Sequence, residues 1–235
     1  MPAVVVTGAR QGIGAAIAEA FAEAFGAGAQ VALVARSEGK LEAVAERCRA
    51  HGATAEPFPC DVTDDAAVAA MAAAVQERFG VPDVLVNNAG LFQPGGLLDL
   101  DPAAFREQVE VNLTSAYLVT RAFLPALLER GAGDLFFMAS VAALRGYPGG
   151  AAYCAGKHGL LGLARVVREE TKAHGLRVTA LLPGATFTPS WEGTELPEER
   201  FMPPEDVARA VVDLHRLSGR TVAEEVLLRP QHGDV

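Results

Sequence analysis

Cysteine is scarce in this chain, and its placement excludes two kinds of protein. The 235 residues contain only Cys48, Cys60 and Cys154, which are scattered and never spaced as a CxxC pair. An odd, dispersed set of thiols is unlike the disulfide framework of a small secreted protein or the ligand set of a structural zinc site. We therefore expect reduced, buried thiols, a cytoplasmic location and no metal centre.

Positive charge is also scarce. Lysine and arginine together number 20 against 29 acidic residues, which gives a net charge of −9 without any basic block. A nucleic acid or an anionic membrane is therefore not expected as a partner. The amino-terminal segment lacks the basic start and long apolar stretch of a secretory signal. No uncharged apolar run reaches the length of a membrane span.

Strand and helix patterns alternate along the whole chain without a linker or repeat. Half of the residues are apolar, and this length is enough to bury a substantial core. The alternation predicts one doubly wound (Rossmann-type) α/β domain, residues 1–235, whose parallel sheet has about seven strands with helices on both faces. Pro125 is expected to kink or interrupt the longest helix. The expected strands are 3–6, 30–35, 53–58, 82–86, 134–139, 176–182 and 224–229; the expected helices are one ending near 25, then 38–51, 64–79, 101–130, 152–174 and 204–218.

A glycine-rich turn, TGARQGIG, follows the first expected strand and precedes a helix. Glycines there permit a tight turn and close approach of the main chain to a pyrophosphate, and the helix N-terminus offers N–H groups to the phosphates. The spacing G-x3-G-x-G departs from the G-x-G-x-x-G pattern, and a purely structural turn is the alternative. The predicted dinucleotide contacts in this turn are Thr7, Gly8, Arg10, Gln11, Gly12, Ile13 and Gly14.

The end of the second expected strand carries Arg36 and Ser37, where NAD-binding proteins place a carboxylate. A guanidinium can bind the 2′-phosphate of NADP in bidentate fashion, whereas a carboxylate repels it. We therefore expect NADP in preference to NAD, with Arg10 as a second positive contact. A solvated surface arginine is the alternative. Asp61 and Val62 follow the third strand, where an adenine ring would lie.

Ser140, Tyr153 and Lys157 combine residue types that this chain uses sparingly, since it has three tyrosines, three lysines and five serines. A tyrosine and a lysine four positions apart lie on one face of a helix. A phenol titrates near ~10, and a nearby cation is expected to lower that pKa enough for proton transfer at neutral pH. Ser140 could hydrogen-bond the oxygen that Tyr153 protonates. The alternative is an ordinary helix start rich in small residues.

Several short motifs follow one another along the chain. They are Thr7-Gly8-x3-Gly12-x-Gly14, Asp61-Val62, Asn87-Asn88-Ala89-Gly90, Asn112, Ser140, Tyr153-x3-Lys157, and Pro183-Gly184 with Thr188. In this order they resemble the short-chain dehydrogenase/reductase family over nearly the whole chain. The resemblance implies that Tyr153 is the general acid/base and that Ser140 holds the substrate carbonyl. It implies that Lys157 lowers the tyrosine pKa and binds the nicotinamide ribose.

The same resemblance assigns further residues. Asn112 would anchor a water that connects the lysine to solvent, although a polar residue turned inward on a helix is the alternative. The implied additional cofactor contacts are Asn88, Ala89, Gly90, Pro183, Gly184, Thr186 and Thr188, besides Tyr153 and Lys157.

Mostly apolar residues are expected to line a pocket over the nicotinamide, which predicts an apolar or aromatic carbonyl substrate. The segment 185–203 is short for a substrate lid and contains the only tryptophan, which serves either as a pocket wall or as core packing. Arg145, the strong charge nearby, would pair a substrate carboxylate or lie on the surface. The predicted substrate contacts are Leu91, Phe92, Ser140, Tyr147, Phe187 and Trp191, with Val141 and Ala142 beside them.

These observations predict an NADP(H)-dependent oxidoreductase that moves a hydride between the nicotinamide and a carbonyl/secondary alcohol pair, with NAD as a possible cofactor. One alternative is a 3-oxoacyl-[acyl-carrier-protein] reductase, which would need a basic surface at the pocket mouth. Another is a dinucleotide-sensing protein without turnover. The resemblance also implies a homodimer or homotetramer formed through helices 101–130 and 152–174. The sequence does not specify the substrate.

Overall fold

Seven parallel strands form one central sheet in the computed structural model, which describes residues 1–233. The strand order is β3-β2-β1-β4-β5-β6-β7, which confirms the predicted doubly wound fold. All five residues of β1 are buried, as expected for a strand that is covered on both faces. The strands are β1 (Ala3–Thr7), β2 (Gln30–Ala35), β3 (Thr54–Pro59), β4 (Val84–Asn87), β5 (Gly133–Met138), β6 (Leu176–Pro183) and β7 (Glu225–Leu228).

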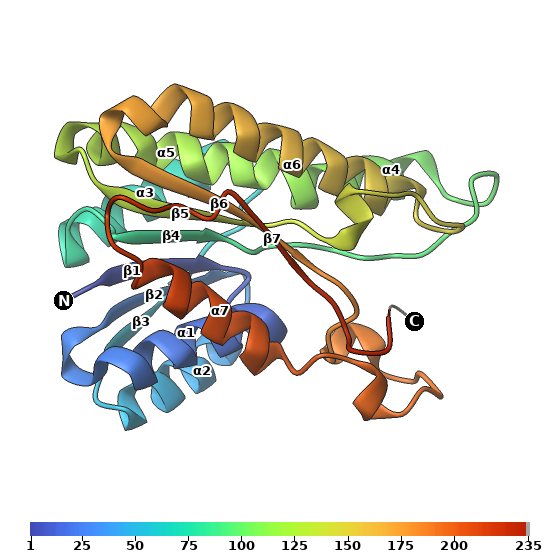
Figure 1. Ribbon diagram of the computed structural model, residues 1–235, viewed down its shortest axis with the longest axis horizontal. Coiled ribbons are helices and arrows are strands. Elements are labelled where there is room, and N and C mark those ends of the chain that lie inside the picture. The colour runs from blue at the N-terminus through green and yellow to red at the C-terminus, as the bar shows by residue number, and fades with distance from the viewer. Residues whose placement is uncertain (234–235) are drawn as a thin grey trace.

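Helices cover both faces of the sheet and enclose one apolar core on each side (Figure 1). The three cysteines are free and lie buried in these layers, as expected. One face carries α1 (Gly12–Phe25), α2 (Glu38–Ala50) and α7 (Pro204–His215), and the other carries α3 (Asp65–Phe79), α4 (Pro102–Val109), α5 (Ser115–Arg130) and α6 (Ala151–Thr171).

The predicted helix 101–130 is interrupted, but not at Pro125. Pro125 lies within α5, which continues to Arg130, so this proline does not interrupt the helix, and a kink there stays a prediction. Instead, the five residues Glu110–Thr114 form a π turn between α4 and α5. By length and composition alone, Pro102–Arg130 would pass as a membrane span. In this fold the segment packs against α3, α6 and β4, so a membrane partner is still not expected.

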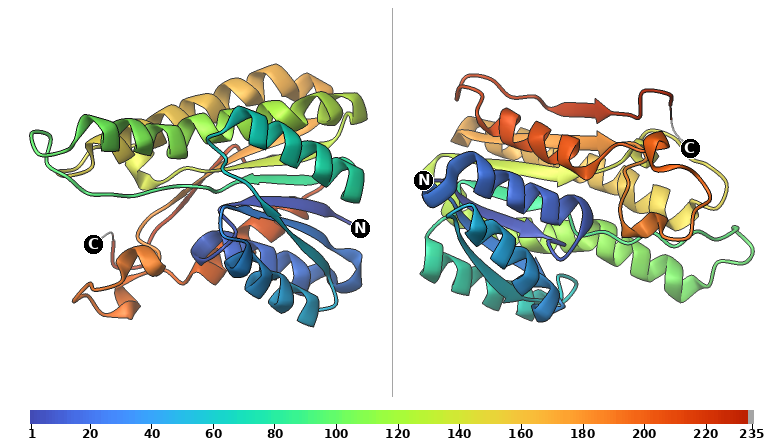
Figure 2. Two further views of the ribbon diagram at one scale, coloured as in Figure 1. Left: turned by 180° about the vertical axis from the view of Figure 1, so that it is seen from behind. Right: turned by 90° about the horizontal axis from the view of Figure 1, so that it is seen from below.

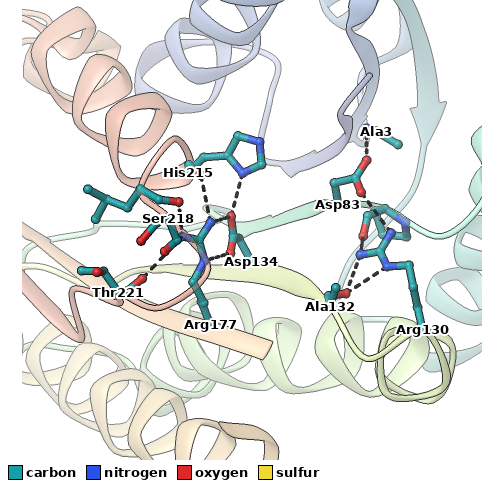
Figure 3. Close-up of polar contacts among 11 residues, drawn as sticks. Ala3, Asp83, Arg130, Ala132, Asp134, Arg177, His215, Ser218 and Thr221 are labelled. Carbon is teal, nitrogen blue, oxygen red and sulfur yellow. Dashed lines mark hydrogen bonds and ion pairs between the residues drawn. The ribbon is translucent and has the colours of Figure 1, made fainter. Parts of the chain in front are cut away.

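Two polar networks lie at the end of the sheet where the strands begin (Figure 3). The buried carboxylate of Asp134 accepts from Arg177 Nε at 2.5 Å and Nη2 at 2.6 Å, and the Nδ1 atom of His215 lies 2.6 Å away. Arg177 also donates to main-chain oxygens at and beyond the end of α7. In the second network, Asp83 accepts from the Ala3 N–H and from Arg130. Both networks fix strand starts and helix ends, far from the loops described next.

The loops that follow the carboxyl ends of β4 and β6 project from the opposite end of the sheet. The long connection 88–101 and the segment 185–203 extend from that end on opposite sides (Figures 1 and 2). The base of segment 185–203 is pinned, because Met202 donates to the Ala185 oxygen at 3.0 Å and accepts from Phe187 at 2.8 Å. Ligands of doubly wound sheets bind at this end of the strands.

Candidate functional site

A cavity of about 460 Å³ opens at the carboxyl ends of β1, β4, β5 and β6. This size suits a small-molecule site. The fold brings most of the predicted site residues to its wall. Those that line it are Gly8, Arg10, Gln11, Gly12, Ile13, Gly14, Asn88, Gly90, Leu91, Phe92, Asn112, Ser140, Tyr147, Tyr153, Lys157, Pro183, Gly184, Thr186, Thr188 and Trp191, together with Val141, Ala142 and Arg145.

The glycine turn brings the start of α1 very close to the loop after β4. A Cβ atom on Gly14 would lie 2.4 Å from Asn88 Nδ2 and 2.6 Å from the Gly8 oxygen. Gly8 and Gly12 have φ values of +67° and +58°, which L side chains rarely adopt. The N-cap residue of α1 makes no side-chain capping bond, and its first turn holds no acidic residue. The first N–H groups of α1 are therefore available to an anion.

Thr7 positions this region from behind the cavity. Its buried hydroxyl accepts from the N–H groups of Asn88 at 2.9 Å and Ala89 at 3.0 Å, and donates to the Val86 oxygen. Asn88 in turn donates from Nδ2 to the Thr7 oxygen at 2.9 Å. Thr7 and Ala89, predicted as cofactor contacts, are absent from the cavity wall. Thr7 joins β1 to the loop after β4, and its contact with a cofactor stays a prediction.

Asn112 lies in the π turn and anchors the loop that carries Leu91. Its Nδ2 donates to the Leu91 oxygen at 2.6 Å, and its Oδ1 accepts from the Leu91 N–H at 3.2 Å. Nδ2 also donates to the oxygen of Gln108 at 2.8 Å, the carbonyl that a regular α-helix would pair with the Asn112 N–H. A side chain inserted into the helical ladder in this way accounts for the π turn. The water-anchoring role of Asn112 stays a prediction.

Gln108 is a site-supporting residue that the sequence analysis missed. It is fully buried and makes a reciprocal pair with Gln93, because Oε1 accepts from the Gln93 N–H and Nε2 donates to the Gln93 oxygen, both at 3.0 Å. Gln108 and Asn112 are four residues apart on one helix face. Two amide side chains at this spacing in a largely apolar helix need hydrogen-bond partners, and this was the sequence signal for a supporting role of Gln108.

Ser140, Tyr153 and Lys157 meet at the cavity as their spacing predicted. The Lys157 ammonium donates to the Met138 oxygen at 2.8 Å and lies 5.6 Å from the centre of the Tyr153 ring. Ser140 Oγ accepts from the Ala142 N–H at 3.1 Å. Burial lowers the pKa of Lys157 to about 8. Ser140, by hydrogen bonding, acts to lower the pKa of Tyr153, so the two hydroxyls converge.

The expected net lowering of the Tyr153 pKa is wrong for this structure. Its pKa is raised, chiefly because burial disfavours the phenolate, and this outweighs the hydrogen bond with Ser140. The Lys157 ammonium is directed at the Met138 oxygen rather than at the phenol. Spacing of four residues places the lysine beside the ring, but it does not fix which oxygen the ammonium contacts.

Aromatic side chains dominate the part of the cavity wall nearest Tyr153. The Phe92 ring meets the Tyr153 ring edge-on, with centroids 5.1 Å apart. Trp191 lines the cavity and also packs on Phe201 at 4.8 Å, so it is both wall and packing. Phe187 packs on Phe201 and lines an adjoining groove between α1 and α7, and its contact with a substrate stays a prediction.

The remaining predicted cofactor contacts lie beyond the cavity wall. Arg36 is exposed directly after β2, followed by the half-exposed Ser37. The pKa of Asp61 is lowered, first by its hydrogen bonds from Thr63 and, less strongly, by the positive charge of Arg36. Asp61, Val62 and Arg36 therefore gather at the end of β2 and β3. Within residues 1–233, no group of three or more His, Cys, Asp or Glu side chains is placed to hold a metal ion.

Comparisons with known proteins agree with this geometry. The family model described as short chain dehydrogenase matches residues 2–198. A sepiapterin reductase from Chlorobaculum tepidum is 35% identical over 99% of this chain and 97% of its own length.

Two solved structures extend the similarity to three dimensions. An alcohol dehydrogenase from the archaeon Thermococcus sibiricus, complexed with 5-hydroxy-NADP, has a TM-score of 0.91 and 33% identity over 100% of this chain and 99% of that chain. A metagenomic short-chain oxidoreductase in complex with NADP has a TM-score of 0.86 and 38% identity, covering 98% of this chain and 97% of that chain.

Proposed function

The chain belongs to the short-chain dehydrogenase family and is an oxidoreductase, and from this premise we propose that it interconverts carbonyl compounds and secondary alcohols with NADP(H). The observation that carries the proposal is the convergence of Ser140, Tyr153 and Lys157 on a cavity that also contains the uncapped start of α1. Hydride transfer to a carbonyl needs a proton donor beside the oxygen and a place for a dinucleotide.

The residues present fit a dinucleotide. The open N–H groups of α1 suit a pyrophosphate, and any side chain at Gly14 would collide with Asn88 and Gly8. Arg10 lines the cavity, and Arg36 stands exposed at the end of β2. A guanidinium at either position favours the 2′-phosphate of NADP. The 5-hydroxy-NADP and NADP bound in two similar structures support the same choice.

The bound nicotinamide would supply or accept the hydride, and the side chains would manage the proton. Ser140 and the Tyr153 hydroxyl would both donate hydrogen bonds to the substrate oxygen. These bonds strengthen as negative charge develops there, which lowers the barrier. Tyr153 would then pass its proton to that oxygen. The buried Lys157 ammonium, close to the ring, would stabilise the resulting phenolate.

The test is oxidation of NADPH, followed by its absorbance, with a panel of aldehydes, ketones and diketones. We expect turnover of several members. If NADPH binds but no member of a broad panel is reduced, the enzymatic proposal fails and a dinucleotide-sensing role replaces it. A 3-oxoacyl thioester should be offered both free and attached to an acyl carrier protein. A strong preference for the carrier-bound form would favour the 3-oxoacyl-[acyl-carrier-protein] reductase alternative.

We further propose a homodimer or homotetramer that pairs the outer faces of α4, α5 and α6. Large apolar side chains are exposed there: Phe105 on α4 is 38% exposed, Tyr117 on α5 48% and Val166 on α6 53%. Burial of such a face against a second copy would remove apolar surface from water. Light scattering after gel filtration tests the proposal, and a monomer at micromolar concentration would contradict it. A cytoplasmic location stays an expectation.

A further inference from the structure

Gly150 lies directly against the ring of Tyr147. A Cβ atom at Gly150 would be 2.6 Å from Cε2 and 2.9 Å from Cζ of that ring, and 3.0 Å from Cys154 Sγ. Gly150 has φ −100° and ψ 14°, a conformation open to any residue. Its backbone therefore does not require glycine. What the missing side chain provides is room for the tyrosine ring.

Short hydrogen bonds hold the turn that presents this ring. The Gly150 N–H donates to the Tyr147 oxygen at 3.1 Å, and the Cys154 N–H donates to the Gly150 oxygen at 2.7 Å. The Cys154 thiol lies 3.7 Å from the Arg145 oxygen. Burial, then the neighbouring Cys154 and Tyr153, raise the pKa of Tyr147. The Tyr147 phenol is thus neutral at pH 7, its residue is 39% exposed, and these hydrogen bonds fix its turn at the start of α6.

The same turn is joined to the loop that carries Phe92. The Gly95 N–H donates to the Gly149 oxygen at 3.0 Å, within a parallel bridge between Gly95 and Gly150. Gly149 has φ +78°, which favours glycine. Two aromatic walls of the cavity, Phe92 and Tyr147, are therefore held by one junction between two loops.

From these contacts we propose that Gly150 is a positioning residue that lets Tyr147 stand as a fixed aromatic wall, and that this wall selects carbonyl compounds with a flat aromatic group beside the carbonyl. The inference rests on the proposed function. An aromatic wall already held in place stacks on a planar ligand without further loss of side-chain freedom. Trp191 and Phe92 present further aromatic surface to the same ligand.

Gly150→Ala tests the proposal, because the added methyl group must displace the Tyr147 ring. The probes are 1-phenyl-1,2-propanedione and the aliphatic 2,3-butanedione, each titrated in the presence of NADP. Trp191 is the only tryptophan and lies in the cavity, so its fluorescence reports binding without turnover. We expect the ratio of the two affinities to fall about fivefold or more. Gly146→Ala is the matched control, since outside its two chain neighbours a Cβ there would meet no described atom within 4 Å, and the ratio should not change.

A double-mutant cycle completes the test. Tyr147→Ala should lower the ratio by itself, and adding Gly150→Ala to that variant should have no further effect. An unchanged ratio in either single variant overturns the proposal, as does an equal effect of Gly150→Ala with and without Tyr147. If Gly150→Ala fails to fold, Tyr147→Ala alone decides. If the protein prefers the phenyl compound but never oxidises NADPH, the proposed function is rejected, whereas the role of Tyr147 as an aromatic wall is retained.

Discussion

Lys157 donates from Nζ to the main-chain oxygen of Met138 at 2.8 Å, directly beside the Tyr153 ring. The lysine side chain comes from α6, whereas Met138 ends β5, so this bond ties the helix to the sheet where the cavity opens. Burial leaves the lysine 4% exposed and lowers its pKa to about 8. The lysine proposed to support the proton chemistry is thereby kept at a cost to the folded state.

That cost predicts a pH dependence of stability. The pKa of Lys157 falls from 10.5 to about 8 on folding, so the unfolded chain binds more protons between about pH 8 and pH 10. The contribution of Lys157 to stability is therefore least favourable below pH 8 and improves as pH rises through this window. Urea unfolding at each pH should show the native protein gaining stability relative to Lys157→Met. If the free energy of unfolding of both proteins changes equally with pH, the lowered pKa of a buried Lys157 is contradicted.

Tyr153→Phe should abolish most turnover while NADPH still binds. Removal of the phenol hydroxyl leaves Ser140 as the only side-chain donor proposed for the substrate oxygen. A lost general acid typically costs ~10²–10⁴-fold in rate. Steady-state kinetics and NADPH fluorescence measure the two quantities separately. Tyr117→Phe, on the exposed side of α5, is the control and should behave as the native enzyme; comparable activity in both variants would remove Tyr153 from the mechanism.

The positions of the strands and the Ser140–Tyr153–Lys157 meeting point could be predicted because local patterns determine them. Short apolar runs specify buried strands, and a four-residue spacing specifies one helix face. The π turn at Asn112 could not be predicted in this way, since it depends on Leu91 reaching the helix from a distant loop. The direction of the Tyr153 pKa shift was wrong for a similar reason. Burial is a property of the whole fold, and it outweighs the neighbours that the sequence displays.

Long-range packing also decided the substrate side of the cavity. Phe187 is only four residues from Trp191, yet Phe187 lines the adjoining groove whereas Trp191 lines the cavity. The role of Gly150 could not be predicted from its glycine-rich stretch, because only the folded turn brings the Tyr147 ring against it. Short-range patterns thus brought together the residues proposed for the proton chemistry, whereas the shape of the pocket required the fold.

Arg36→Asp should shift cofactor preference toward NADH. A carboxylate at the end of β2 would repel the 2′-phosphate and could accept from the ribose hydroxyls of NAD. We expect the ratio of kcat/KM for NADPH to that for NADH to fall about tenfold or more, since hydrogen bonds to charged groups contribute about 1.5–3 kcal/mol. Arg36→Lys should keep most of the preference. An unchanged ratio in Arg36→Asp would mean that Arg36 does not contact the 2′-phosphate. Arg10 would then be the remaining candidate for that contact.

Arg177→Met should destabilise the fold without altering substrate affinity. Asp134 and Arg177 form an ion pair (Figure 3). Their side chains are 7% and 18% exposed, so removing the guanidinium leaves a buried carboxylate with His215 alone. Breaking a buried pair from one side typically costs about 3–5 kcal/mol. The exposed pair of Arg209 with Asp206 is the control, and Arg209→Met should change the free energy of unfolding by less than about 0.5 kcal/mol.

The double variant Arg177→Met with Asp134→Leu separates the cost of an unpaired charge from the value of the pair. If the loss in Arg177→Met arises from the stranded carboxylate, replacing Asp134 as well should recover a large part of it. If the loss arises instead from the carbonyls that Arg177 holds at the end of α7, the double variant should be no more stable than the single one. Equilibrium urea unfolding decides between them. The KM for the carbonyl substrate should stay constant throughout, because this network lies at the opposite end of the sheet from the cavity.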